Sequence, residues 1–330
     1  MLIATIIIII AAFFVQLSPM AIARDSIVAP KPAMPGQVMG VVIINERQES
    51  VGPAVLSAVR SVVPAYPQEP SVPLLKNIHQ SPPEVSATSA VVFDIDSRKV
   101  LYEKNPDVIS AIASITKLMT ALVALELRPN FDSEYVVTDD DRREGGRIYL
   151  FRGDRVTIDD LFHASLVGSG NSETIALVHS LGMTEADFVD KMNAKAVSLG
   201  LRQTTFADPV GLDARNTSTA YELIEIVRAA LAQEKIRGAV TRDSYTLTTQ
   251  QGSTRIIEST DALLSTASNY QVVGGKTGYI GSAGFCFVGK FKDKAGEHPI
   301  VSVVLGSQSV TSRFSETDAL VRWAYENHEW

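Results

Sequence analysis

ASITKLMTALVALE, residues 113–126, predicts a helix whose side chains are apolar on every side. Only Lys117 and Glu126 carry a charge in this stretch. A helix without a polar face is usually buried in the core of a domain. Burial of an ammonium group is unfavourable unless the group is paired or loses its proton. The position of Lys117 therefore indicates a chemical role, and Ser114 stands three residues before it.

The spacing of Ser114 and Lys117 places both on one face of a helix, one turn apart. A serine hydroxyl is a weak nucleophile that needs an adjacent base, and burial lowers the pKa of a lysine toward neutrality. The N-terminal end of a helix also favours negative charge that develops near Ser114. We predict that Lys117 removes the proton of Ser114. Alone the pair is weak evidence for a catalytic site, because an S-x-x-K tetrad arises by chance on the order of once in a chain of this length. A buried lysine can also pack its stem against apolar neighbours while its ammonium group reaches water.

Two further motifs strengthen this prediction. Residues 169–171 read S-G-N and residues 276–278 read K-T-G, and each pattern occurs once in the chain. The first residues of the three motifs are 55 (169 − 114) and 107 (276 − 169) positions apart. The trio in this order is the signature of penicillin-binding proteins and class A β-lactamases. The three motifs together favour a functional site over a chance match.

The chain resembles the serine D-alanyl-D-alanine carboxypeptidases, which are low-molecular-mass penicillin-binding proteins, over nearly all of residues 86–330. Besides the three motifs, the segments MNAKAVSLGL, TTFADPVGLD, NTSTAYEL and GGKTGYIGSAGFCFVG read like that family. The resemblance implies a serine DD-peptidase of the shorter, soluble type. Some members of that type are D,D-endopeptidases, which cut peptidoglycan cross-links.

The resemblance also implies a set of catalytic residues. Ser114 would be the acylated nucleophile and Lys117 its base. Ser169 would relay a proton to the leaving amine, and Asn171 would form a hydrogen bond with the substrate amide. Lys276 would supply positive charge.

Substrate-binding residues follow the third motif. Thr277 of Lys276-Thr277-Gly278 would contact the substrate carboxylate, and the backbone N–H groups of Ser114 and Tyr279 would form the oxyanion hole. Arg313 is a candidate second ligand of the carboxylate, because a guanidinium matches both carboxylate oxygens. It opens the last predicted helix after the strand at residues 299–307, which we expect to lie close to the K-T-G strand. The alternative is a solvated arginine near a helix start.

The order of predicted elements indicates an α+β fold. A strand hairpin at residues 88–105 is followed by a helix-rich block at 157–235, strands return after about residue 244, and a helix spans 311–330. This pattern predicts an antiparallel sheet flanked by helices, with an inserted helical region. The fold that the resemblance implies is β-lactamase/transpeptidase-like.

Composition excludes several other classes. The net charge of −7 argues against nucleic acid as a partner, and the single cysteine, Cys286, rules out an internal disulfide and a cysteine-rich metal site. Cys286 lies in an apolar run and is predicted to be a buried structural thiol. None of the five histidines has the H-E-x-x-H spacing of a zinc peptidase. We expect neither a metal nor a cofactor.

The N-terminal region predicts export. Residues 1–23 have the apolar core and small-residue end of a signal peptide cut after Ala23. Residues 24–85 contain ten of the fifteen prolines and predict a disordered linker. Residues 86–330 would form the catalytic domain. We expect the mature protein in the periplasm or on the cell-wall side of the cytoplasmic membrane.

The predicted activity is removal of the terminal D-alanine from peptidoglycan stem peptides through an acyl-enzyme, in cell-wall maturation, with β-lactam antibiotics as covalent inhibitors. The alternative is a D,D-endopeptidase. A β-lactamase would need a second base, typically a glutamate, but RQTTFADPVGLD at residues 202–213 contains only Asp208 and Asp213 as acids. A non-catalytic β-lactam sensor is a further alternative, and sensors are usually fused to a transmembrane signalling region.

Overall fold

The computed structural model describes residues 71–76 and 80–330. The predicted signal peptide at residues 1–23 and most of the predicted linker at 24–85 lie outside the described residues. Within that linker, β1 (Leu74–Leu75) pairs in antiparallel fashion with β13 (His328–Glu329) at the other end of the chain. The last residues of the predicted linker therefore include one short strand.

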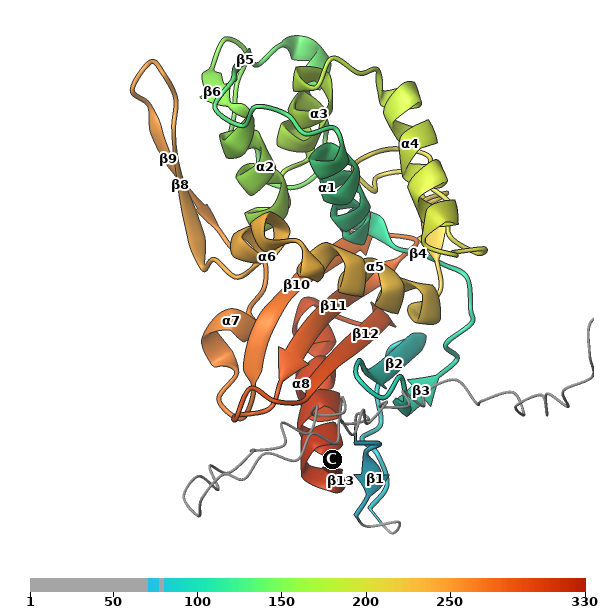
Figure 1. Ribbon diagram of the computed structural model, residues 1–330. Helices are drawn as coiled ribbons and strands as arrows, with labels where there is room; N and C mark the ends of the chain where they lie inside the picture. Colours follow the sequence, from blue (N-terminus) through green and yellow to red (C-terminus); the bar gives the residue numbers. More distant parts are fainter. Residues whose placement is uncertain (1–70, 77–79) are drawn as a thin grey trace, which may run out of the picture. The chain divides into compact units, whose positions relative to one another are not determined.

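The centre of the fold is a five-stranded antiparallel sheet with the strand order β10-β11-β12-β2-β3. Its strands are β2 (Ser89–Asp94), β3 (Val100–Lys104), β10 (Gln271–Ile280), β11 (Gly284–Lys292) and β12 (Pro299–Ser307). Strands β2 and β3 form the predicted hairpin, with Ala90 opposite Lys104. The sheet thus combines strands that precede the helical block in the sequence with strands that follow it, as the colours in Figure 1 show.

The helical region is inserted between β3 and β10. Its helices are α1 (Thr116–Glu126), α2 (Ile158–Val167), α3 (Asn171–Ser180), α4 (Glu185–Ser198), α5 (Ala220–Ala232) and α6 (Glu234–Val240). Short 3₁₀ turns η1 (Ala113–Ile115) and η2 (Asp139–Asp141) and three two-stranded pairs complete it. These pairs are β4 (Ser110–Ala111) with β7 (Thr217–Ser218), β5 (Glu134–Val136) with β6 (Arg155–Thr157), and β8 (Ser244–Thr248) with β9 (Thr254–Glu258). The predicted helix-rich insertion is confirmed.

Threonine and serine side chains define where several helices begin. Thr157 accepts a hydrogen bond from the backbone N–H of Asp160 in α2, and Asp160 completes a capping box. Thr184 and Thr219 likewise accept a hydrogen bond from a backbone N–H, that of Asp187 in α4 and that of Glu222 in α5. Each cap satisfies an N–H group that has no partner inside the helix.

Both faces of the sheet are buried. The inner side chains Val91 and Phe93 of β2 belong to one apolar cluster with α1, α2 and α5. Their neighbours Ala90 and Val92 point to the other face and belong to a second cluster with α8 (Val310–Asn327). Every residue from Thr116 to Ala124 in α1 is buried, which confirms the burial predicted for this helix.

The C-terminal helix differs from its prediction at one end. α8 ends at Asn327, whereas the sequence predicted a helix through Trp330. The last residues instead leave the helix axis, and His328–Glu329 pair with β1. The short helix α7 (Leu263–Thr266) precedes β10. No helix in the described part of the chain combines the length and the apolar character that a membrane span needs.

Candidate active site

Ser114 lies in the 3₁₀ turn η1, immediately before α1, and not in the α-helix that the sequence predicted from residue 113. Ala113 has a φ of +48°, a left-handed conformation that costs energy for a residue with a side chain. Gly211, whose φ is +91°, packs directly against it, since a Cβ on Gly211 would collide with the Ala113 carbonyl. The turn that presents Ser114 is therefore strained and tightly enclosed.

Lys117 is completely buried, and its Nζ reaches three oxygens at 2.9 Å: Ser114 Oγ, Asn171 Oδ1 and the carbonyl oxygen of Val210. An amide oxygen and a carbonyl oxygen can only accept hydrogen bonds, so each of them takes one N–H of Lys117. The third position of the amine faces Ser114. It carries a proton in the ammonium form and a lone pair in the neutral form.

Burial lowers the pKa of Lys117 from its ordinary value to about 7, and the negative charges of Asp208 and Glu173 partly oppose this shift. The neutral amine is therefore present near neutral pH. In that form its lone pair can accept the proton of Ser114 across the 2.9 Å that separate Nζ and Oγ.

Lys276 joins the K-T-G strand to the S-x-N motif. It lies on β10, is 1% exposed, and donates a hydrogen bond to Ser169 Oγ at 2.7 Å. Burial holds its pKa well below the ordinary value, and the positive charges of Lys117 and Arg313 lower it further. Ser169 has a φ of +56° between α2 and α3, so the backbone at this side of the site is strained as well.

Asn171 is the first residue of α3, and its side chain is 5% exposed. Its Oδ1 accepts from Lys117, and its Nδ2 donates to the carbonyl oxygens of Glu144 at 3.1 Å and Gly145 at 2.8 Å. The amide thus links the buried lysine to the loop that follows η2. Its predicted contact with the substrate amide remains a prediction.

The residues after Lys276 lie at the free edge of the sheet, because β10 is the terminal strand. Thr277 donates from its hydroxyl to Thr260 Oγ1 at 2.7 Å. A Cβ on Gly278 would lie 2.7 Å from the Ile112 carbonyl oxygen, so only glycine lets β10 approach the segment before Ser114 this closely. The Tyr279 side chain is half exposed and stacks on Phe285.

Arg313 reaches the same strand from α8. Its Nη1 donates to the Gly278 carbonyl oxygen at 3.4 Å, and its guanidinium lies over the Phe314 ring, 4.7 Å from the centroid. Among the described residues, the buried Nε of Arg313 has no hydrogen-bond partner. Strand β12 was expected close to the K-T-G strand, but β11 lies between β12 and β10. Arg313 reaches the site because α8 packs against β11 and β12.

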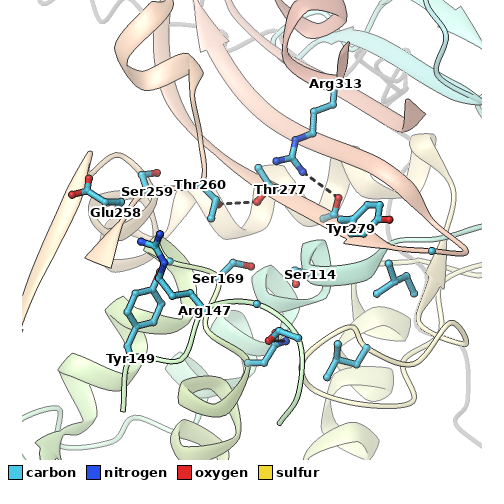
Figure 2. Close-up of a pocket in the computed structure, with 18 residues that line it drawn as sticks. Ser114, Arg147, Tyr149, Ser169, Glu258, Ser259, Thr260, Thr277, Tyr279 and Arg313 are labelled. Atoms are coloured by element: carbon cyan, nitrogen blue, oxygen red, sulfur yellow. Dashed lines mark hydrogen bonds between the residues drawn. The ribbon is translucent and has the colours of Figure 1, made fainter. Parts of the chain in front are cut away.

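A cavity of 710 Å³ collects these groups (Figure 2). Of the predicted site residues, its lining contains Ser114, Ser169, Asn171, Thr277, Gly278, Tyr279 and Arg313. Lys117 and Lys276 are buried and reach this site through Ser114 and Ser169. The structure therefore brings together all nine residues that the sequence singled out.

The lining also contains residues that the sequence analysis missed. Their side chains come from two segments that carry no motif, and they include Arg147, Tyr149, Glu258, Ser259 and Thr260. Arg147 and Tyr149 follow η2, while the other three lie at the end of β9 and just after it. The pairing of β8 with β9 and a hydrogen bond from the Thr260 N–H to the Val167 carbonyl oxygen at 3.2 Å bring the second segment to the cavity, and no local pattern signals either contact.

The remaining reactive side chains serve the packing of the domain. Cys286 is buried as predicted, and burial raises the pKa of its thiol to about 11. Nδ1 of the buried His163 lies 2.9 Å from the Asp159 carbonyl oxygen, and His179 contacts Asp141. Among residues 71–76 and 80–330, no three His, Cys, Asp or Glu side chains cluster as metal ligands would.

Comparison with known proteins identifies the family. The profile of the D-alanyl-D-alanine carboxypeptidase family matches residues 76–309, which contain all three motifs. The chain belongs to this family. It is therefore a serine-type hydrolase, a DD-peptidase, of the penicillin-binding type that acts on peptidoglycan.

Relatives of this DD-peptidase carry two different names. The D-alanyl-D-alanine endopeptidase of Escherichia coli (strain K12) is 30% identical over 246 residues, which cover 74% of this chain and 78% of that protein. The D-alanyl-D-alanine carboxypeptidase DacF of Bacillus subtilis (strain 168) is also 30% identical, over 74% of this chain and only 63% of that protein. The family therefore leaves open which bond the chain cuts.

Solved structures confirm the predicted fold of the DD-peptidase. A Streptomyces DD-transpeptidase superimposes with a TM-score of 0.69 at 26% identity, over 75% of this chain and 100% of that one. A penicillin-binding protein homologue from Mycobacterium tuberculosis also has a TM-score of 0.69, at 28% identity, over 77% of this chain and 96% of that one. The β-lactamase/transpeptidase-like α+β class is thus established.

Proposed function

We propose that the protein is an exported DD-carboxypeptidase that removes the terminal D-alanine from peptidoglycan stem peptides through an acyl-enzyme. One observation carries the proposal: the buried Lys117 Nζ lies 2.9 Å from Ser114 Oγ at the floor of a cavity that the other two motifs also line. A nucleophile and a base within hydrogen-bond reach are the requirement for serine acyl transfer. The same Ser114 would be acylated by β-lactam antibiotics.

Acylation would begin when the neutral amine of Lys117 takes the hydroxyl proton of Ser114. The Ser114 Oγ forms a bond to the carbonyl carbon of the penultimate D-alanine, and the carbonyl oxygen becomes an oxyanion. The backbone N–H groups of Ser114 and Tyr279 would stabilise that charge. When the C–N bond breaks, the leaving amine would take the hydroxyl proton of Ser169, and Lys276, whose Nζ donates to that hydroxyl at 2.7 Å, would replace it. Water would then attack the ester carbonyl while its proton passes through Ser169 to Lys276, and the departing Ser114 Oγ would recover its proton from Lys117.

Two residues would hold the carboxylate beside the scissile bond. Thr277 and Arg313 both line the cavity, the first from β10 and the second from α8. A guanidinium matches both oxygens of a carboxylate, and a hydroxyl can donate to one of them. Lys276 adds positive charge beneath them. The predicted substrate is thus a peptide with a free terminal carboxylate.

Acylation of the purified protein tests the nucleophile. Intact-mass analysis after incubation with benzylpenicillin should show one adduct with the full mass of the antibiotic, because opening of the β-lactam ring releases no atoms. Ser114→Ala should abolish the adduct, and Ser110→Ala in β4 is the matched control that keeps it. An unchanged adduct on Ser114→Ala would assign the chemistry to another residue.

A D,D-endopeptidase is the second candidate, because the cavity continues beyond Ser169 and Thr277 to Arg147, Tyr149 and Glu258. D-alanine alone does not extend that far. Digestion of purified peptidoglycan followed by mass spectrometry separates the two activities. A carboxypeptidase shortens monomeric stem peptides by one D-alanine, whereas an endopeptidase splits dimeric muropeptides into monomers.

A β-lactamase is disfavoured by the surroundings of Asp208. Its carboxylate accepts three backbone hydrogen bonds, from Val210, Gly211 and Asp213, each at 2.6 Å, and so shapes the loop beside Lys117. A carboxylate occupied in this way is a poor base for water. Slow loss of the penicillin adduct over hours is the expected result, whereas rapid turnover of benzylpenicillin would support a β-lactamase.

Export is part of the proposal. Cleavage after Ala23 would leave Arg24 as the first residue of the mature protein, in the periplasm or on the cell-wall side of the cytoplasmic membrane. N-terminal sequencing of the protein from its native cell tests this point. A sequence that begins at Met1 and is recovered from membranes would instead indicate a retained anchor.

A further inference from the structure

The cavity has a charged end that the three motifs do not account for. Arg147 and Glu258 line it together with Tyr149. In Figure 2 these side chains lie beyond Ser169 as seen from Ser114, with Glu258 beside Ser259. The charged end is thus separated from the nucleophile by the hydroxyl group of Ser169.

The charged end lies on the leaving-group side of the site. If the scissile carbonyl is at Ser114 and the carboxylate beside it is at Thr277, the leaving amine faces Ser169. Any further atoms of the leaving group then extend toward Arg147 and Glu258. D-alanine offers nothing to these two side chains, because its carboxylate is already bound and its side chain is a methyl group.

Arg147 and Glu258 carry opposite charges but do not neutralise each other. Both side chains are exposed, and within the described residues neither forms an ion pair. Both act on the hydroxyl of Tyr149: burial raises its pKa, Arg147 opposes that shift, and Glu258 reinforces it. Arg147 and Glu258 thus bring a hydrogen-bond donor and an acceptor to the same cavity.

The segment that carries Arg147 is fixed on both sides of it. Asn171 Nδ2 donates to the Gly145 carbonyl oxygen at 2.8 Å. The buried carboxylate of Glu173 accepts hydrogen bonds from the backbone N–H groups of Tyr149 at 2.9 Å and Leu150 at 3.0 Å. Both anchors come from α3, the helix that begins with Asn171. The backbone at Arg147 is thus placed by the same helix that contacts Lys117.

A guanidinium only donates hydrogen bonds and a carboxylate only accepts them. The chemical partner that satisfies both is a peptide, whose carbonyl oxygens accept and whose N–H groups donate. We propose that Arg147 and Glu258 bind the leaving half of the substrate when the leaving amine belongs to a second peptide, with Arg147 donating to its carbonyl or carboxylate oxygens and Glu258 accepting from its N–H groups. This inference rests on the proposed DD-peptidase function.

Two substrates with the same acyl half test the inference on the mature protein. In one the leaving group is D-alanine. In the other it is a D-amino acid residue whose carboxylate lies beside the scissile bond and whose side chain continues into a second peptide. The values of kcat/KM are measured for both by separation of the products. We expect Arg147→Ala and Glu258→Gln each to lower the ratio of the second value to the first about tenfold, as loss of a charged hydrogen bond does.

Arg152→Ala is the matched control. Arg152 is exposed and follows Arg147 in the same segment, but it pairs with Asp139 at 2.8 Å and lies outside the cavity lining. Arg152→Ala should leave kcat/KM unchanged for both substrates. Thermal unfolding checks the folding of every variant, and Arg147→Lys, which keeps the charge but loses the planar fork, replaces Arg147→Ala if the alanine variant does not fold.

Each outcome decides between the two claims. If the protein releases D-alanine but does not cut the second substrate, or if both variants leave the ratio within twofold, the inference is wrong and the proposed function stands. If a variant lowers kcat/KM by the same factor for both substrates, the residue does not bind the leaving peptide, and the inference is also wrong. If the unaltered protein cuts neither substrate, the proposed function itself fails, and the inference fails with it.

Discussion

Lys276 Nζ donates a hydrogen bond to Ser169 Oγ at 2.7 Å, across 107 positions of sequence. Lys276 belongs to the edge strand of the sheet and Ser169 to the turn between α2 and α3. The contact therefore joins the sheet to the inserted helical region at the cavity. A second buried lysine, Lys117, reaches Ser114 from α1 in the same way. Two lysine–serine pairs thus face one cavity, and each predicts a separate proton transfer.

Ser169→Ala removes the hydroxyl that is proposed to pass a proton to the leaving amine. We expect kcat for D-alanine release to fall about 10²-fold, the lower end of the range for general acid catalysis, with a smaller change in KM. Steady-state kinetics on a peptide ending in D-Ala-D-Ala measures both constants. Ser180→Ala, at the far end of α3, is the control. A kcat within twofold of the unaltered enzyme would mean that another group protonates the amine.

The pKa of Lys117 predicts a pH dependence of acylation. Because burial lowers this pKa to about 7, Lys117 is protonated below pH 7 and cannot accept the Ser114 proton. The rate of acylation by benzylpenicillin should fall about tenfold per pH unit below pH 7 and level off above it, since the neutral fraction follows the titration of one group. Rapid-mixing measurements from pH 5 to pH 9 test this profile.

Lys117→Arg is the companion variant, because a guanidinium stays protonated throughout that pH range. Its acylation should be slower by at least about 10²-fold and should lose the rise near pH 7. Circular dichroism establishes that the variant is folded. Near-normal acylation by Lys117→Arg would place the base elsewhere.

Arg313→Ala tests the carboxylate site. Hydrolysis of a D-Ala-D-Ala peptide should slow about tenfold more than hydrolysis of the same peptide with an amidated C-terminus, since only the acid offers a charge to the guanidinium. Arg322→Ala is the control, because Arg322 lies on the same helix and pairs with Asp318 at 3.0 Å. An equal loss of hydrolysis rate on the acid and the amide peptide would show that Arg313 does not bind the carboxylate.

Glu173 predicts an effect on stability. Its carboxylate is completely buried and accepts hydrogen bonds from the backbone N–H groups of Tyr149 and Leu150, which Glu173→Ala would leave unsatisfied. The free energy of unfolding should fall by about 1–3 kcal/mol. Glu173→Gln, which keeps an acceptor oxygen, should lose less. Denaturant titration measures both, with the exposed Glu134→Ala as control. No change in Glu173→Ala would show that other groups hold this loop.

Several features were predictable because they depend on residues close in sequence. The apolar stretch at residues 113–126 predicted a buried helix, and α1 is buried from Thr116 to Ala124. Two strand-like runs around a turn at Asp96-Ser97-Arg98 predicted the hairpin of β2 and β3. Ser114 and Lys117 needed only one turn of backbone to come together, so their contact followed from spacing. The order of the three motifs then indicated the family and, through it, the remaining site residues.

Other features depend on how distant segments pack. The carbonyl oxygen of Val210 completes the environment of Lys117, but a backbone atom carries no sequence signal. Arg147 and Glu258 come from two loops that no motif marks, and only the folded chain brings them to one cavity. Sequence alone thus predicted the residues to which we assign the chemistry, because spacing and residue type define them. The tertiary structure decided the shape and charge of the leaving-group side, because these arise from loop packing and strand pairing over more than a hundred residues.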